Sequence, residues 1–117
     1  MDYSKLYKDV LNIDPKVRFA TVCDMTGKML SGGHREGVKN LLTPEESMRS
    51  LQQSATAWKS RNELASKIGK GRYVLAEYEK IKRIVVPLDD NHLLYVTTEV
   101  EADHASIIKS IMKLKAK

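Results

Sequence analysis

Cysteine is almost missing from this chain, which has 117 residues and carries only Cys23. A single cysteine rules out an intrachain disulfide and leaves no mark of an oxidising compartment. Long apolar runs are missing as well, because stretches such as IVVPL and LLYV are far shorter than the roughly 20 residues that span a bilayer. The amino terminus also lacks the uninterrupted apolar centre of a secretory signal. We therefore expect a cytoplasmic protein without membrane association.

The residue patterns that usually carry catalysis or bind metal ions are missing too. His34, His92 and His104 show neither a His-x-x-x-His spacing nor a paired-cysteine spacing. The nearest acidic cluster, at residues 99–104, is more typical of a strand end and a capped helix start. Cys23 lies in a strand pattern, where a small buried thiol is the usual outcome, and no nucleophile signature is present. We expect no enzyme, no metal site and no cofactor.

Basic residues exceed acidic ones, 20 to 15, so the net charge is +5. Such a balance favours acidic partners, nucleic acid among them. The basic residues are scattered, however, and their densest group is Lys113, Lys115 and Lys117. These three fit the end of a helix, where cations interact favourably with the dipole. Nucleic-acid binding is therefore an alternative that only the net charge favours.

Apolar spacing and turn residues predict the elements of the first half of the chain. A helix is expected over residues 2–13, ahead of Pro15, and two strands follow at 17–24 (VRFATVCD) and 28–32 (KMLSG). The sequence Thr-Pro-Glu-Glu at 43–46 has the pattern of a capping box with proline in the first helical position. It predicts a long helix from Pro44 to Ile68, which Gly69 then stops.

The second half predicts three strands and a last helix. The strands are RYVLAEYEK (72–80), IKRIVVPL (81–88) and HLLYVTTEV (92–100), and the helix covers 103–117. Apolar residues occur on both faces of these strands, which indicates a sheet with helices on both sides. The predicted fold class is α+β, with a five-stranded antiparallel sheet between helices and the order α-ββ-α-βββ-α.

One broad apolar stripe runs along the predicted 44–68 helix. It suits a helix that lies on a sheet and also touches a second subunit, with Trp58 as its main anchor. The stripe consists of Met48, Leu51, Ala55, Trp58 and Ala65, with Ala57, Leu64 and Ile68 beside it. A small-molecule sensor is the second alternative, and it needs a cavity between this helix and the sheet. We expect Trp58 to fill that space.

The stretch SGGHREGVKN at residues 31–40 packs three glycines, a histidine and charged groups into a short segment. We interpret Gly32 and Gly33 as a strand end or bulge. His34, Arg35 and Glu36 then form an exposed tip. A phosphate loop is disfavoured, because Glu-Glu at 45–46 already places carboxylates at the following helix start. The stretch therefore predicts a bend that offers a surface to a partner.

The predicted order of elements resembles the roadblock/dynein-light-chain group of the profilin-like architecture. The stretches DPKVRFATV, GGHREGV before LTPEES, IGKGRYVLAEYEKIKRIVVPL and HLLYVTTEVEADHASII also resemble an uncharacterised family of small proteins from ammonia-oxidising archaea. Roadblock-like proteins commonly form homodimers through edge strands and long helices, and many dock small GTPases or act as scaffolds. The resemblance implies a single roadblock-like domain over residues 1–117, homodimeric and non-catalytic. The partner-binding residues that we expect are Trp58, Leu51, Ala55, Tyr73, Leu75, His34 and Arg35.

Overall fold

The computed structural model describes residues 1–116 and contains five strands and four helices in that range. In chain order these are α1 (Tyr3–Leu11), β1 (Val17–Asp24), β2 (Met29–His34), α2 (Pro44–Asn62), α3 (Ala65–Ile68), β3 (Val74–Glu77), β4 (Ile81–Asp89), β5 (His92–Glu99) and α4 (His104–Lys115). Lys117, the end of the predicted last helix, lies outside the described residues.

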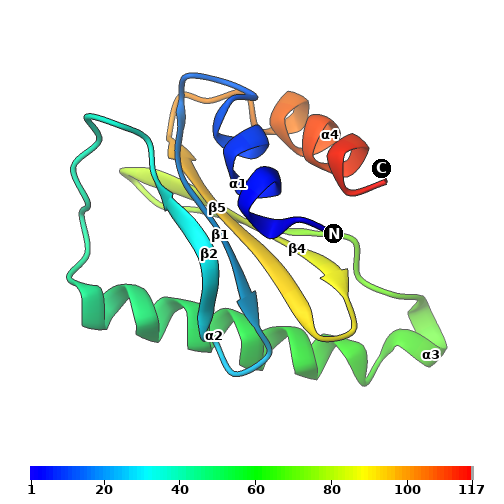
Figure 1. Cartoon of the computed structure of the whole chain (residues 1–117). Coiled ribbons are helices and arrows are strands. Elements are labelled where there is room, and N and C mark those ends of the chain that lie inside the picture. The colour runs from blue at the N-terminus through cyan, green and yellow to red at the C-terminus, as the bar shows by residue number, and fades with distance from the viewer. Residues whose placement is uncertain (117) are drawn as a thin grey trace.

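All five strands belong to one antiparallel sheet with the order β2-β1-β5-β4-β3 (Figure 1). The predicted α+β class and element order are therefore confirmed. β5 lies at the centre between β1 and β4, while β2 and β3 are the two edges. The first strand of the predicted triplet is shorter than expected, because β3 covers only residues 74–77 of the predicted 72–80.

Helices cover both faces of the sheet, as the two-sided apolar pattern predicts. α1 and α4 pack on one face, where the core includes Val22, Ile84, Val96 and Ile111 (Figure 1). α2 crosses the other face alone, over Cys23, Val85, Leu93 and Tyr95. The central strands are thus buried on both sides, which explains why they read as nearly continuous apolar runs.

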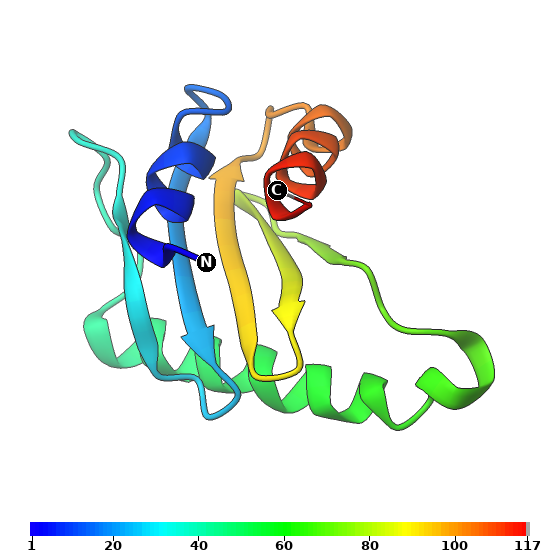
Figure 2. The ribbon, with the colours of Figure 1, turned by 45° about the vertical axis from the view of Figure 1, so that its right-hand side comes forward.

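The start of α2 follows the predicted capping box. Thr43 Oγ1 accepts a hydrogen bond from the Glu46 N–H at 3.1 Å, and the Glu46 carboxylate accepts one from the Thr43 N–H at 2.9 Å. The predicted end at Ile68 is wrong: α2 ends at Asn62, and the short helix α3 follows at residues 65–68. The last part of α2 and the whole of α3 extend beyond the sheet (Figure 2). No apolar surface therefore supports a continuous helix there.

The glycines of strand β2 lie inside the strand, not at its end, because β2 continues to His34. The irregularity in pairing lies nearer Leu30, where Val22 pairs with Ser31 and the next residue of β1 pairs with Met29. A Cβ atom on Gly32 would lie only 2.4 Å from Thr21 Oγ1 and 2.6 Å from Thr21 Cα. Glycine is required here because the two neighbouring strands approach too closely for a side chain.

Arg35 is not part of an exposed tip, and this expectation is wrong for a specific reason. Its guanidinium donates hydrogen bonds to the backbone carbonyl oxygens of Val17 and Asp14, both at 2.8 Å, and also to that of Leu11. These carbonyls belong to the end of α1, the following turn and the start of β1. Arg35 therefore fastens α1 to the sheet, and His34 and Glu36 alone are exposed.

The two neighbouring glycines give a matched pair of substitutions. Gly32→Ala should lower the free energy of unfolding by about 2–3 kcal/mol, because the new methyl group overlaps the Thr21 backbone. Gly33→Ala should cause no loss, or a gain of up to about 1 kcal/mol, because its Cβ would meet only Tyr7 Cε1 at 3.6 Å. Denaturant unfolding of both variants measures the difference. Equal stabilities would contradict the close approach.

Arg35→Met should lower the free energy of unfolding by about 2–3 kcal/mol, because three carbonyl oxygens lose a charged donor. Arg35→Lys should recover only part of the loss, since an ammonium group lacks the planar fork that reaches several acceptors. Lys39→Met, in the same loop, is the control and should change stability by no more than about 0.5 kcal/mol. If Arg35→Met matches this control in urea unfolding, the fastening role is refuted.

Candidate functional site

The three predicted partner residues on the long helix are covered by the chain's own sheet. Leu51, Ala55 and Trp58 are all buried, and Trp58 is only 3% exposed. They pack against Cys23 and Tyr95 in the second core. Trp58 is thus the anchor of α2, as expected, but the surface that a partner could touch lies at other residues.

The first candidate surface surrounds the edge strand β3, and we call it the β3 edge surface. Tyr73 and Tyr78, the residues directly before and after the strand, are exposed, and Leu64 and Ile68 are exposed farther away, before and in α3. Ile68 is 81% exposed, which is unusual for isoleucine. Leu75, the other predicted partner residue on this strand, is half-buried against the core under α1 and α4. Tyr73, directly before β3, is exposed beside the open edge of the sheet.

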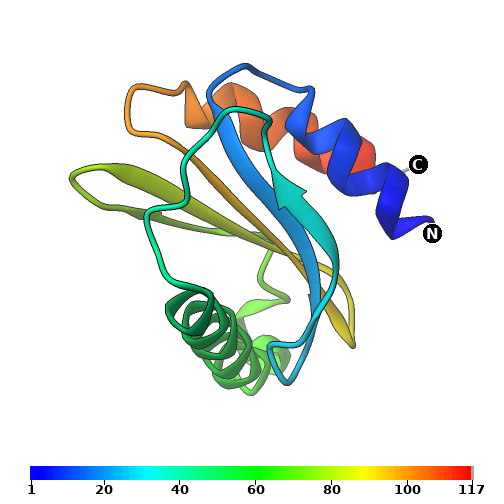
Figure 3. The same cartoon turned by 60° about the vertical axis from the view of Figure 1, so that its left-hand side comes forward.

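The second candidate surface is a groove between strand β2 and the first turns of α2, which we call the β2–α2 groove. Its volume is about 590 Å³. The residues that line it are mostly apolar or uncharged: Phe19, Thr26, Gly27, Lys28, Met29, Gly33, His34, Asn40, Pro44, Ser47, Met48, Leu51 and Gln52. Figure 3 shows the arrangement behind it, with α2 below the sheet and the 35–43 loop joining β2 to the helix.

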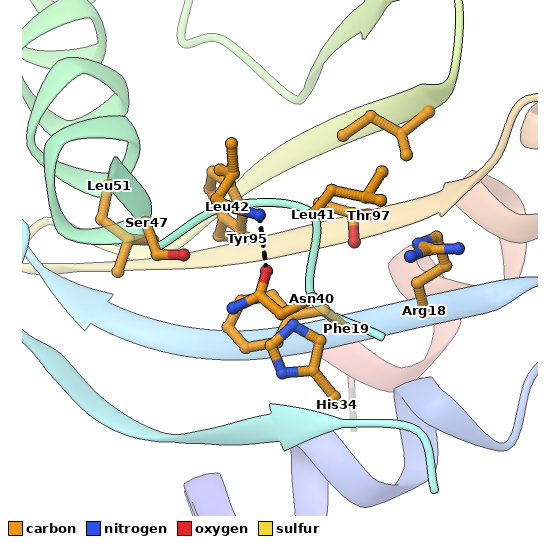
Figure 4. Close-up of a pocket in the computed structure, with 11 residues that line it drawn as sticks. Arg18, Phe19, His34, Asn40, Leu41, Leu42, Ser47, Leu51, Tyr95 and Thr97 are labelled. Atoms are coloured by element: carbon orange, nitrogen blue, oxygen red, sulfur yellow. Dashed lines mark hydrogen bonds between the residues drawn. The ribbon is translucent and has the colours of Figure 1, made fainter. Parts of the chain in front are cut away.

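The 35–43 loop covers one end of this groove, where a smaller pocket of about 50 Å³ lies beneath it (Figure 4). Phe19, His34, Asn40, Ser47 and Leu51 line both spaces, so the two adjoin each other. Two attachments order the loop. The first joins two of its own residues, since the Asn40 side-chain oxygen accepts a hydrogen bond from the Leu42 N–H at 3.1 Å.

Arg18 supplies the second attachment of the loop. Its guanidinium donates to the Lys39 carbonyl oxygen at 2.8 Å and to the Glu99 carboxylate at 2.7 Å. The loop is thereby tied to the end of β5. The covered end of the groove is consequently closed by a loop that hydrogen bonds hold in place, while the end between Met29 and Met48 stays open.

His34 stands between the two spaces, and its electrostatic setting favours the neutral ring. The imidazole packs against Phe19 with ring centroids 4.5 Å apart and the two ring planes tilted by 40° (Figure 4). Burial lowers the pKa of His34 below its usual 6.5, and the positive charge of Arg18 lowers it further, while Asn40 opposes the change. The groove therefore has little charge at neutral pH.

Two further groups that chemistry might use have structural roles. Cys23 is fully buried, as predicted, and burial raises the pKa of its thiol to about 11, so it is protonated at neutral pH. Lys82 is a buried lysine that the sequence gives no reason to single out. Its Nζ donates to the Ala102 carbonyl oxygen and lies at 2.9 Å from His104 Nδ1. It joins β4 to the start of α4.

Two kinds of feature are absent from the described part of the chain. Residues 1–116 contain no group of three or more His, Cys, Asp or Glu side chains placed to hold a metal ion. Across the same residues, none of the helices is both long enough and apolar enough to cross a membrane.

Sequence reasoning missed most of the groove and the pocket beside it, since Phe19, Met29 and Leu42 come from three separate segments. One local signal was present. An apolar residue just before a helix cap, such as Leu42 here, usually packs against the fourth helical residue, but that residue is Ser47. Leu42 therefore lacks its local partner and turns toward the pocket instead (Figure 4).

The pKa of His34 gives a test of this geometry. Because the folded pKa is lower than the unfolded value of about 6.5, the associated stability is present above pH 6.5 and is lost as the pH falls through the folded pKa. Nuclear magnetic resonance titration should show His34 titrating below 6.5, and Arg18→Gln should move the pKa partly upward. The control His34→Gln should reduce the loss of stability between pH 7 and 5. A value at or above 6.5 contradicts the arrangement.

Comparison with known proteins places the architecture. No protein-family model matches the chain, and no curated protein matches it. Solved structures, in contrast, superpose on it over nearly its whole length. A roadblock/LC7 domain from Streptomyces avermitilis superposes with a TM-score of 0.77 at 17% identity, covering 99% of this chain and 93% of that one.

Two other solved structures extend the comparison. The gliding protein MglB from Thermus thermophilus gives a TM-score of 0.77 at 16% identity, over 97% of this chain and 82% of that chain. Profilin from Schizosaccharomyces pombe gives 0.66 at 14% identity, over 98% and 94%. At such identities a likeness shows architecture alone. The chain has the roadblock/profilin-like fold.

Proposed function

We propose that this chain is a cytoplasmic, non-catalytic interaction scaffold that forms a homodimer and docks a small GTPase or another signalling protein. It would act as one roadblock-like domain over residues 1–117. The observation that carries the proposal is the open edge of β3, which has the exposed side chains of Tyr73 and Tyr78 directly before and after it. Exposed apolar residues beside an unpaired strand edge are typical of an interaction site.

The open edge of β3 is suited to pairing with a second copy of itself. The Tyr78 N–H donates to the Ile81 carbonyl oxygen inside the β3–β4 hairpin at 2.8 Å. Since hydrogen-bonding groups alternate along a strand, the backbone groups of Tyr73, Leu75 and Glu77 face away from β4. Two copies related by a two-fold axis can pair these groups in an antiparallel ladder.

The sequence of the strand favours one register for this ladder. A pair centred on Leu75 places Leu75 against its own copy, and Arg72 of one chain opposite Tyr78 of the other. Tyr73 then faces Glu77, so no like charges oppose each other between residues 72 and 78. A shift by two residues would instead set Arg72 against Lys80 and Leu75 against Glu77. The register centred on Leu75 is therefore preferred.

The solved structures of the same fold support an assembly of this kind without fixing its form. One structure of an MglB protein has a tetrameric arrangement. The protonated, buried thiol of Cys23 also supports a role without nucleophilic catalysis by this residue. A small GTPase as partner is proposed from the resemblance of the sequence to roadblock-like proteins.

The homodimer is tested by mass and by cross-linking. Light scattering at tens of micromolar should give twice the 13.3 kDa of one chain. Leu75→Cys should form a covalent dimer on mild oxidation, because hydrogen-bonded antiparallel partners have Cα atoms about 5.5 Å apart, within disulfide range. The native Cys23 is buried and should stay silent.

Ala76→Cys is the matched control for this experiment. In the same register two copies of residue 76 lie roughly 8 Å apart at Cα, beyond disulfide reach. It should therefore remain uncoupled. A strictly monomeric mass, or equal coupling by both variants, would refute this dimer.

The partner class requires a separate experiment. The tagged chain, purified from its native host, should retain a small GTPase or another signalling protein identified by mass spectrometry. The oxidised Leu75→Cys dimer should retain the same partner if docking needs two copies. Recovery of nucleic acid with binding that falls steeply with salt would favour the nucleic-acid alternative instead.

A further inference from the structure

The other edge of the sheet has a different character, and the β2–α2 groove lies directly beside it. We propose that the free edge of β2 binds an extended segment of a partner protein, which adds a sixth strand and places alternate apolar side chains in the β2–α2 groove. This inference rests on the proposed function only in taking the chain to act by binding proteins. β2 and β3 are at opposite edges of the sheet, roughly 19 Å apart, so it does not depend on the homodimer.

The hydrogen-bonding groups of β2 argue for an extended backbone as the occupant. Within residues 1–116 this strand pairs with β1 alone. The Arg35 N–H donates inward to the Arg18 carbonyl oxygen at 2.8 Å, and the Ser31 carbonyl oxygen accepts inward from Thr21 Oγ1 at 3.0 Å. Alternation then directs the backbone groups of Gly32 and His34 outward. A row of such donors and acceptors matches another strand, whereas a compact apolar molecule would leave it unpaired.

Apart from the pairing irregularity near Leu30, β2 lacks the features that normally protect a free edge. Natural sheets blunt their edges with charged residues such as lysine, with proline, with bulges or with very short strands. The six residues of β2, MLSGGH, contain none of those side chains. Met29 is 52% exposed, and Leu30 is exposed beside it. β3, in contrast, has only four residues and includes Glu77. An unprotected apolar edge indicates a surface that is covered in use.

The groove beside this edge can receive side chains from an added strand. The room for them is the groove of about 590 Å³ itself, because Thr21 fills the space beside Gly32. Met48, 57% exposed, faces Met29 across the groove. Methionine side chains are unbranched and adapt to different apolar groups. Two of them on opposite walls fit a partner segment with varied apolar residues.

Charge restricts the partner further. Lys28 carries the one permanent charge among the described residues that line the groove, and no carboxylate lines it. The nearby Asp24 carboxylate already accepts hydrogen bonds from Thr26 and from the Lys28 N–H. A segment with an acidic residue next to its apolar ones is therefore complementary to the hairpin end of the groove. A basic segment is not.

The test starts from a phage library of random twelve-residue peptides selected at pH 7 on the wild-type chain. The consensus peptide, synthesised with a fluorophore, is titrated by anisotropy against four variants. His34→Pro removes one outward N–H, and its matched control His34→Ala removes the ring but keeps that N–H. Met48→Glu places a negative charge in the groove, and Met48→Leu keeps an apolar side chain.

The expected consensus has alternating apolar residues and at least one acidic residue. His34→Pro should bind the consensus peptide roughly tenfold more weakly than His34→Ala. A backbone hydrogen bond to the peptide is lost, and the proline ring obstructs the added strand. Met48→Glu should weaken binding at least as much, while Met48→Leu should stay within about threefold of wild type. Thermal unfolding should show that the proline and alanine variants are equally folded.

Several outcomes would overturn the proposal. One is a library that yields no peptides enriched over those that bind an unrelated protein of equal pI, and another is a basic consensus among the selected peptides. Equal affinity of His34→Pro and His34→Ala for the consensus peptide would overturn the proposal as well. Binding of the dye 1-anilinonaphthalene-8-sulfonate, blocked by Met48→Glu, with no peptide selected would show a small-molecule pocket instead. Light scattering distinguishes a loss of peptide binding at β2 from a loss of the homodimer, since His34→Pro should keep the molecular mass of the wild type. A monomeric chain that still binds the peptide would refute only the dimer.

Discussion

The packing of one helix, α2, across a five-stranded sheet is the constraint on which the rest of the structure depends. A helix is about 10 Å wide with its side chains, whereas five strands extend over roughly 24 Å. Leu51, Ala55 and Trp58 fix α2 over Cys23, Val85, Leu93 and Tyr95, which belong to the three middle strands. Both edge strands consequently lie at the margin of the helix, although Val74 of β3 still packs against this core. The β3 edge surface and the β2–α2 groove are the two results of this mismatch.

The opposite face of the sheet does not have this problem, because two helices share it. α1 packs over β1 and β2, and α4 lies beside it (Figure 1). Arg35 secures this arrangement from the end of β2, through carbonyls that precede or begin β1. The strand that presents its free edge to solvent is therefore rigidly held from its other face. A rigid edge needs little reordering when a partner strand pairs with it.

The sequence predicts the elements of this fold well because their signals are local. The capping box at Thr43 and the continuous apolar runs of β1, β4 and β5 require no knowledge of distant residues. The errors arise where distant residues decide. The helix predicted to reach Ile68 stops at Asn62 because the sheet beneath it ends, and helix propensity carries no information on that support. Gly32 reads as a strand end, since glycine weakens strands, until the approach of Thr21 is known.

The candidate sites were less accessible to sequence reasoning for the same reason. An apolar stripe shows that Trp58 and Leu51 are covered, but not whether the cover is the chain's own sheet or a second copy. Tyr73 was named from the resemblance alone, and its position beside an open strand edge became known only from the strand order. Arg35 was misjudged because the carbonyls it contacts are 18 to 24 residues away, and backbone acceptors leave no trace in the sequence. Met29 and Met48 converge only once α2 is placed.

The two edges are suited to different kinds of pairing, and together they define a geometry for assembly. β3 is short and has one register in which it complements itself. β2 is longer, uncharged and bordered by methionines that adapt to other sequences. If two copies join at β3, their ten strands form one sheet whose outer edges are both β2, separated by roughly 43 Å. A partner with two extended segments linked over that distance would gain avidity from the second site. A partner with one segment would bind each end independently, so the stoichiometry of the complex follows from the strand order.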